Sequence, residues 1–184
     1  MKENLSMEKM DNGTIFNKKE LIIGLILKFI VMGFGTFGLI AQAFNNEHSV
    51  GVLNYTFFTV ISNIVVVIMT YIFFIFDLYF LTTKKDLRNQ VWYLLKFTAT
   101  IGIAITFLIY STLLLPPDAS RNGFIGALFK SSHNICVHVI VPIFSIIDFF
   151  YSDYNFKTKK SLFYLSSNLS FIIFHFSFNF IIRF

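Results

Sequence analysis

The sequence has little charge. Asp, Glu, Lys and Arg make up only 14% of its 184 residues, against about 25% in a typical soluble domain, and its mean hydropathy is +0.69. A chain with so few charged side chains lacks the polar surface of a water-soluble globule. Its single cysteine, Cys136, excludes an internal disulfide and a cysteine-based metal cage. The composition therefore predicts a membrane protein, in which the 26 phenylalanines face lipid.

In place of charged residues, the sequence has long apolar stretches. About 20 apolar residues suffice to cross a bilayer. Five such stretches are present, at 21–43, 54–81, 91–115, 127–151 and 162–182. They predict an all-α fold, a multi-pass transmembrane helix bundle with five spans. Residues 21–184 form one transmembrane domain in this interpretation, and residues 1–20 form a flexible cytoplasmic arm. Three glycines in the first span, Gly33, Gly35 and Gly38, suit close helix packing. Pro116 and Pro117 predict a break after the third span.

Basic residues predict the orientation of the spans. The segments 1–20, 82–90 and 152–161 each hold three or more Lys or Arg residues, whereas 44–53 holds none and 116–126 only Arg121. Basic segments stay on the cytoplasmic side, so the N-terminus is expected inside and the C-terminus outside. The same pattern indicates contact with membrane lipids and no nucleic-acid partner. The expected location is the cytoplasmic membrane.

The first span also has features of a signal peptide, because Ala41-Gln42-Ala43 resembles a signal-peptidase site. Its apolar core is about 20 residues long, against 7–15 in a signal peptide. An uncleaved membrane anchor is therefore the preferred interpretation.

Polar side chains interrupt the predicted spans at helical spacing. Thr59, Ser62 and Asn63 fall at i, i+3 and i+4, on one face of the second span. Asn134 and His138 are four residues apart in the fourth span, and the fifth span carries Asn168, His175 and Asn179 on one side. Uncompensated polar groups in hydrocarbon cost several kcal/mol each, so these stripes are expected to meet in a shared interior. The second and fourth spans run in the same direction, which places their stripes at similar depth.

Three interpretations of the stripes remain open. His138 as a general base and Thr59 as a nucleophile would hydrolyse an acyl ester, with Asn63 or Asn134 donating to the oxyanion or orienting the imidazole. The same residues could line a small-solute or proton pathway. They could instead hold helices together by hydrogen bonds, which spacing alone favours.

The remaining ionisable residues predict less. Asp77 and Asp148 are expected to form interfacial ion pairs with Lys84, Lys85 or Lys157, and Lys28 and Lys96 to extend toward the interface. His133, His138 and His175 could hold a metal, but the first two are five residues apart and no deep carboxylate joins them. No metal and no cofactor is predicted.

Two segments carry a family resemblance. Leu53-Asn54-Tyr55-Thr56-Phe57-Phe58-Thr59-Val60-Ile61-Ser62-Asn63 resembles the "YFT-x-x-SN" segment of the bacterial Pr-six-Pr family of membrane proteins. Asn134-Ile135-Cys136-Val137-His138-Val139-Ile140-Val141-Pro142, followed by Asp148-Phe149-Phe150, resembles its "H-x-x-x-P…DW" segment. That family is similar to the eukaryotic androgen-induced-protein family, whose members are threonine hydrolases of fatty acid esters of hydroxy fatty acids.

The resemblance implies a function as well as a fold. It implies a hydrolase of fatty acid esters in which Thr59 is the nucleophile and His138 the base, while Ser62, Asn63 and Asn134 occupy accompanying motif positions. The family has six spans, whereas this sequence predicts five, so the chain is expected to be truncated, frameshifted or a reduced member. Phe149 also replaces the usual tryptophan.

Overall fold

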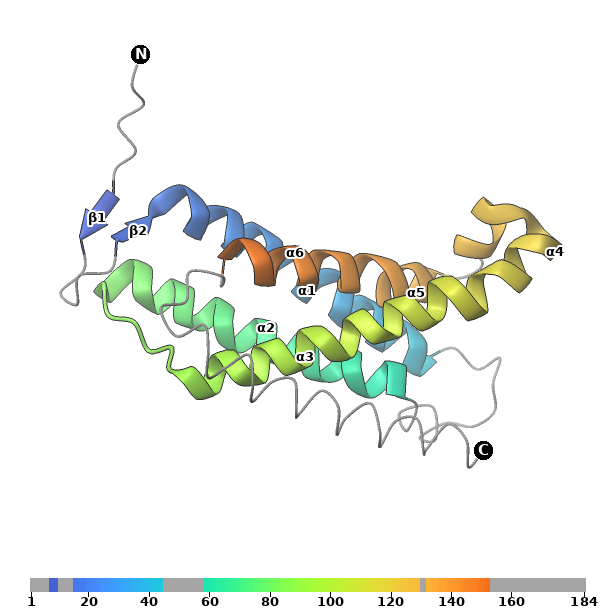
Figure 1. Cartoon of the computed structure of the whole chain (residues 1–184), viewed down its shortest axis with the longest axis horizontal. Coiled ribbons are helices and arrows are strands. Elements are labelled where there is room, and N and C mark those ends of the chain that lie inside the picture. The colour runs from blue at the N-terminus through green and yellow to red at the C-terminus, as the bar shows by residue number, and fades with distance from the viewer. Residues whose placement is uncertain (1–6, 10–14, 45–57, 130–131, 153–184) are drawn as a thin grey trace, which may run out of the picture.

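The computed structural model describes residues 7–9, 15–44, 58–129 and 132–152. In the part of the chain that the structure describes, four helices run side by side (Figure 1): α1 (Lys18–Phe44), α2 (Phe58–Thr83), α3 (Gln90–Ile109) and α6 (Val141–Ser152). Successive helices run in opposite directions, and each packs against two others in the order α1, α2, α3, α6 and back to α1. The result is an up-and-down bundle in which α2 and α6 are parallel, as the sequence predicts.

Shorter elements lie at the two ends of the bundle. The π-helical turn η2 (Tyr110–Leu114) and helix α4 (Leu115–Leu128) extend α3 beyond the bundle, as Figure 1 shows. Helix α5 (Ser132–Ile135) and a second π-helical turn, η3 (Cys136–Ile140), lead into α6. At the other end, strands β1 (Met7–Lys9) and β2 (Ile15–Asn17) form a short antiparallel pair, which the sequence did not predict.

Within the described residues, four helical segments are long and apolar enough to cross a membrane: Lys19–Phe44, Phe58–Thr83, Val91–Leu128 and His133–Tyr151. They match the first four predicted spans and give the chain the character of a membrane protein. The fifth predicted span, 162–182, lies outside the described residues, together with its Asn168, His175 and Asn179.

The helix does not break at Pro116 and Pro117, so that prediction is wrong. It continues through both prolines to a kink at Gly123, whose φ of 73° is a left-handed conformation that suits glycine, and a second helical segment then runs to Leu128. The prolines are tolerated because they occupy the first positions of α4, directly after the widened turn η2.

Each π-helical turn has a proline at the same offset. Pro116 lies two residues after the end of η2, and Pro142 lies two residues after the end of η3. A proline lacks the N–H that an α-helix requires, and its ring clashes with the carbonyl four residues earlier. Widening the preceding turn to π geometry relieves the clash, so these two turns follow from the sequence.

The middle of the bundle is packed with apolar side chains. This apolar cluster consists of Val31, Val66, Val67, Met69, Phe73, Ala99, Ile103 and Val141. Helix α1 approaches it closely at two of the predicted glycines: a Cβ on Gly35 would collide with the Val67 side chain, and one on Gly38 would lie 2.7 Å from Val137 Cγ1. Gly33 has nothing within 4 Å of its added Cβ, so close packing is confirmed for Gly35 and Gly38 and is wrong for Gly33.

Gly38→Ala is expected to destabilise the bundle by about 1–3 kcal/mol, since the new methyl group overlaps Val137 and lies 3.0 Å from Cys136 Cβ. The matched control, Gly33→Ala, should be neutral or stabilising, because alanine is the better helix former by up to about 1 kcal/mol. Unfolding in mixed detergent micelles measures both variants. Equal stability of the two would contradict the packing described.

Candidate functional site

Asn63 joins α2 to η3 at the end of the bundle that carries Thr59 and His138. Its side chain is fully buried, and its amide nitrogen donates to the carbonyls of Thr59 at 2.8 Å and Val137 at 3.2 Å. The first carbonyl belongs to the candidate nucleophile, and the second belongs to the residue before the candidate base. One amide therefore holds both candidate residues on adjacent turns of two helices.

Ser62 makes the corresponding contact between α2 and α3. Its hydroxyl lies 2.9 Å from both the Thr59 carbonyl oxygen and the Thr106 hydroxyl, and the Thr106 hydroxyl lies 3.1 Å from the Gly102 carbonyl oxygen. Each hydroxyl has one proton, so one of the two donates to the other across the helices while the second donates to the carbonyl on its own helix. Hydrogen bonds of this kind join helices in membranes. For Ser62, the structure supports a packing role.

His138 stacks on Tyr110 where the two π-helical turns meet. The ring centroids are 4.3 Å apart and the planes differ by 6°. Tyr110 is buried, and its ring covers one face of the imidazole. No pattern in the sequence predicts this pair directly, although the prolines after both turns mark where the helices widen.

Thr59 and His138 lie at the same end of the bundle, and no hydrogen bond between them is present among the described residues. Within that part of the chain, the buried atoms His138 Nδ1 and Asn63 Oδ1 have no hydrogen-bond partner. Leaving a buried polar atom without a hydrogen bond costs about 1–3 kcal/mol. Both atoms therefore retain the capacity to bind another group. Asn134 is half-buried on α5, four residues before His138.

The structure changes the role expected of Asn63. Both of its amide hydrogens are used by main-chain carbonyls, so it cannot also donate to an oxyanion in this arrangement. The amide orientation is set by those two bonds, because the opposite orientation would face oxygen with oxygen. Of the two asparagines predicted as oxyanion donors, Asn134 is the one whose amide nitrogen is not held in this way.

A network of buried charges occupies the other end of the bundle, near the loop between α2 and α3. Asp148 lies between two lysines, 2.8 Å from Lys28 and 2.7 Å from Lys96. Asp77 lies between Lys28 at 3.1 Å and Arg88 at 3.0 Å. These ion pairs connect α1, α2, α3 and α6 to one another and to the loop.

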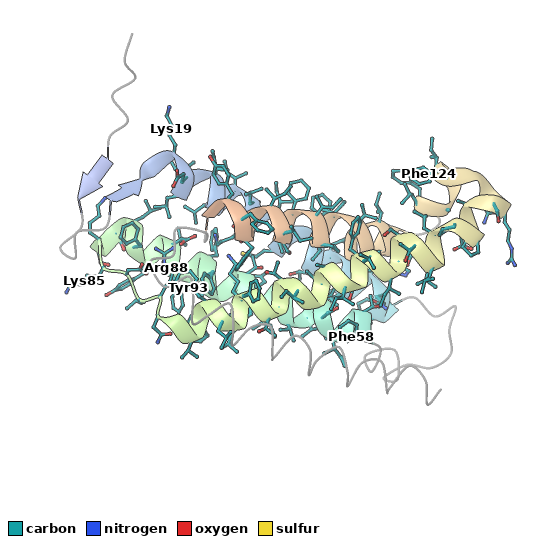
Figure 2. The ribbon with its side chains drawn as sticks, viewed as in Figure 1. Lys19, Phe58, Lys85, Arg88, Tyr93 and Phe124 are labelled. Atoms are coloured by element: carbon teal, nitrogen blue, oxygen red, sulfur yellow. The ribbon has the colours of Figure 1, made fainter. Side chains whose placement is uncertain are left out.

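The surroundings of this network favour charged side chains. The Lys96 ammonium lies 4.5 Å from the centre of the Phe73 ring, and Arg88 also pairs with Asp86 at 2.7 Å. Burial lowers the pKa of the Arg88 guanidinium, but its hydrogen bond to Asp86 and the neighbouring negative charges raise the pKa by more than burial lowers it. The pKa is therefore raised overall. Arg88 therefore stays charged. Figure 2 shows it at the loop end of the bundle beside Tyr93, while Lys85 points outward.

These observations overturn the expectation of interfacial lysines. Lys28 is 0% exposed and Lys96 is 3% exposed, so neither side chain extends to the interface. Asp77 and Asp148, each 1% exposed, pair inside the bundle with Lys28, Arg88 and Lys96. Sequence reasoning missed the network because it paired each aspartate with lysines that follow it closely in sequence.

The two polar regions are separated by the apolar cluster. Along α2, Asn63 and Asp77 are 14 residues apart, or about 21 Å at 1.5 Å per residue. Within the described residues, no three His, Cys, Asp or Glu side chains are grouped so as to hold a metal. The end with His138 retains unused hydrogen-bonding capacity, whereas the charges at the other end neutralise one another.

Lys28→Met is expected to destabilise the bundle by about 3–5 kcal/mol, because it leaves Asp77 and Asp148 buried with one cation fewer. The double variant Lys28→Met/Asp148→Asn should lose less stability than the sum of its two single variants. Unfolding in mixed micelles gives all three values.

Lys85→Met is the matched control, since Lys85 is exposed on the loop, and it should change stability by less than about 0.5 kcal/mol. Additive effects of Lys28→Met and Asp148→Asn would contradict the ion pair.

Comparison of the chain with protein-family models, curated proteins and solved structures finds no match, so the resemblance to the Pr-six-Pr family stays a prediction.

Proposed function

We propose that this chain is a multi-pass protein of the bacterial cytoplasmic membrane that hydrolyses a lipid ester inside its helix bundle. Thr59 is the nucleophile and His138 the general base. The observation that carries the proposal is the Asn63 amide, which binds the carbonyl of Thr59 and the carbonyl of Val137, next to His138. Within the described residues, the buried Nδ1 of His138 has no hydrogen-bond partner, which supports the proposal further.

The reaction uses the chain's own side chains at each step. The Thr59 hydroxyl attacks the ester carbonyl carbon while His138 takes its proton, and His138 then gives that proton to the leaving alcohol. Water, deprotonated by the same imidazole, attacks the acyl-threonine, which releases the fatty acid and restores the hydroxyl. Asn134 donates to the oxyanion. The hydrogen bond between the Thr59 hydroxyl and the His138 imidazole forms when substrate enters, because catalytic hydrogen bonds commonly tighten only in the complex with substrate.

The membrane orientation is part of the proposal. The basic segments 1–20 and 82–90 place the N-terminus and the loop between α2 and α3 in the cytoplasm. The buried charges then lie toward the cytoplasmic side, and Thr59 and His138 lie toward the outer leaflet, where a lipid ester can enter between helices. The chain has five spans in this proposal, with 162–182 as the fifth.

A proton or small-solute pathway is the second candidate, and the buried charges on four helices favour it, because ionisable groups at membrane depth often mark such routes. The apolar cluster between the two polar regions weighs against it, since a pathway needs continuous polar groups or water. Proteoliposome flux that survives Thr59→Ala would favour the pathway over hydrolysis.

Thr59→Ala and His138→Gln are each expected to lower ester hydrolysis by on the order of 10³-fold or more, because they remove the nucleophile and the base. The assay uses purified protein in lipid nanodiscs and a fatty acid ester of a hydroxy fatty acid. Thr59→Ser keeps a hydroxyl and should retain part of the activity.

Thr70→Ala is the matched control, because Thr70 is a second α2 threonine, which is buried and whose hydroxyl donates to the Val66 carbonyl. It should keep hydrolysis within about threefold of the unmodified protein. An active Thr59→Ala protein would contradict the proposal. Variants that lose abundance and activity in parallel would instead indicate that these residues only pack helices.

A further inference from the structure

The rings of Tyr110 and His138 lie closer together and more nearly parallel than the packing of two helices requires. Aromatic rings in proteins commonly pack offset or edge to face, with centroids about 4.5–7 Å apart. These two rings are nearly parallel at 4.3 Å, on different helices, and Tyr110 is only 7% exposed. Both lie in π-helical turns, which are frequent at functional sites.

The stack restricts what the imidazole can do. A histidine ring turns about its χ2 bond, and a flat ring against one face permits only orientations in which the planes stay parallel. The two ring nitrogens lie in that plane, so stacking limits their directions to two, related by a half-turn about χ2, while one face of the ring stays covered. A general base must hold its nitrogen within hydrogen-bond reach of the proton it removes, which requires such control.

We propose that Tyr110 is the positioning residue for His138. Its ring fixes the plane of the imidazole and so directs the nitrogen that accepts the Thr59 proton, which deepens the hydrolase proposed above and rests on it. The aromatic face of Tyr110 supplies this effect, and its hydroxyl is not required. Pro116 and Pro142 support the arrangement, because each follows the π-helical turn that carries one of the two rings.

Tyr110→Leu and Tyr110→Phe test the proposal. Leucine removes the ring and should lower kcat by on the order of 10²-fold, with KM changed by less than about threefold. Phenylalanine keeps the ring and should stay within about threefold of the unmodified protein in both constants. Tyr79→Leu, at an exposed tyrosine of α2, is the control and should change neither.

Proton NMR of the histidine side chains gives a readout that is independent of activity. Stacking should place the His138 ring protons upfield in the unmodified protein and in Tyr110→Phe, and Tyr110→Leu should move them downfield. His138→Gln identifies the signals, and Tyr79→Leu should leave them in place.

The outcomes separate this proposal from the proposed function. An unmodified protein without esterase activity would overturn the hydrolase, and the NMR comparison would then decide the stack alone. Signals that Tyr110→Leu does not move would overturn the stack. A lost stack with kcat retained would overturn the positioning role while leaving the hydrolase intact.

Discussion

Pairing of buried charge is the constraint on which this bundle depends. Asp148 can remain ionised between apolar helices only because Lys28 and Lys96 lie on either side of it. Lys28 in turn requires Asp77, which brings α2 into the same network. Since separating any one of these helices would leave a buried charge without its partner, the ion pairs tie the register of α1, α2, α3 and α6 together.

The two ends of the bundle differ in the hydrogen-bonding capacity that their polar groups retain. At the loop end, cations and carboxylates face one another. At the other end, the Asn63 amide is committed to two carbonyls, whereas Asn63 Oδ1 and His138 Nδ1 keep unused capacity within the described part of the chain. The apolar cluster around Phe73 keeps these regions apart. We therefore expect catalysis at the end of the bundle that carries His138, whereas the ion pairs at the other end hold the helices together.

Sequence reasoning succeeded where the signal is local. Apolar stretches of about 20 residues identified four helices that are long enough to span, and direction alone placed Thr59 and His138 at the same end. It failed for the charge network because the partners of Asp148 lie 120 and 52 residues away in sequence. The continued third helix was missed for another reason: prolines end helices in general, yet a preceding π-helical turn accommodates them.

The distances from the Lys28 and Lys96 Nζ atoms to the Asp148 carboxyl carbon, measured in lipid bilayers by solid-state NMR, test most directly whether buried ion pairs hold the bundle together. With ¹⁵N-labelled lysine and ¹³C-labelled aspartate, we expect a strong dipolar coupling typical of a direct ion pair. The coupling should weaken in Lys28→Arg, which removes one of the two labelled lysines beside Asp148 while keeping the charge, and disappear in Lys28→Arg/Lys96→Arg. A weak coupling in the unmodified protein, or one that Lys28→Arg leaves unchanged, would contradict the claim that these buried ion pairs hold the bundle together.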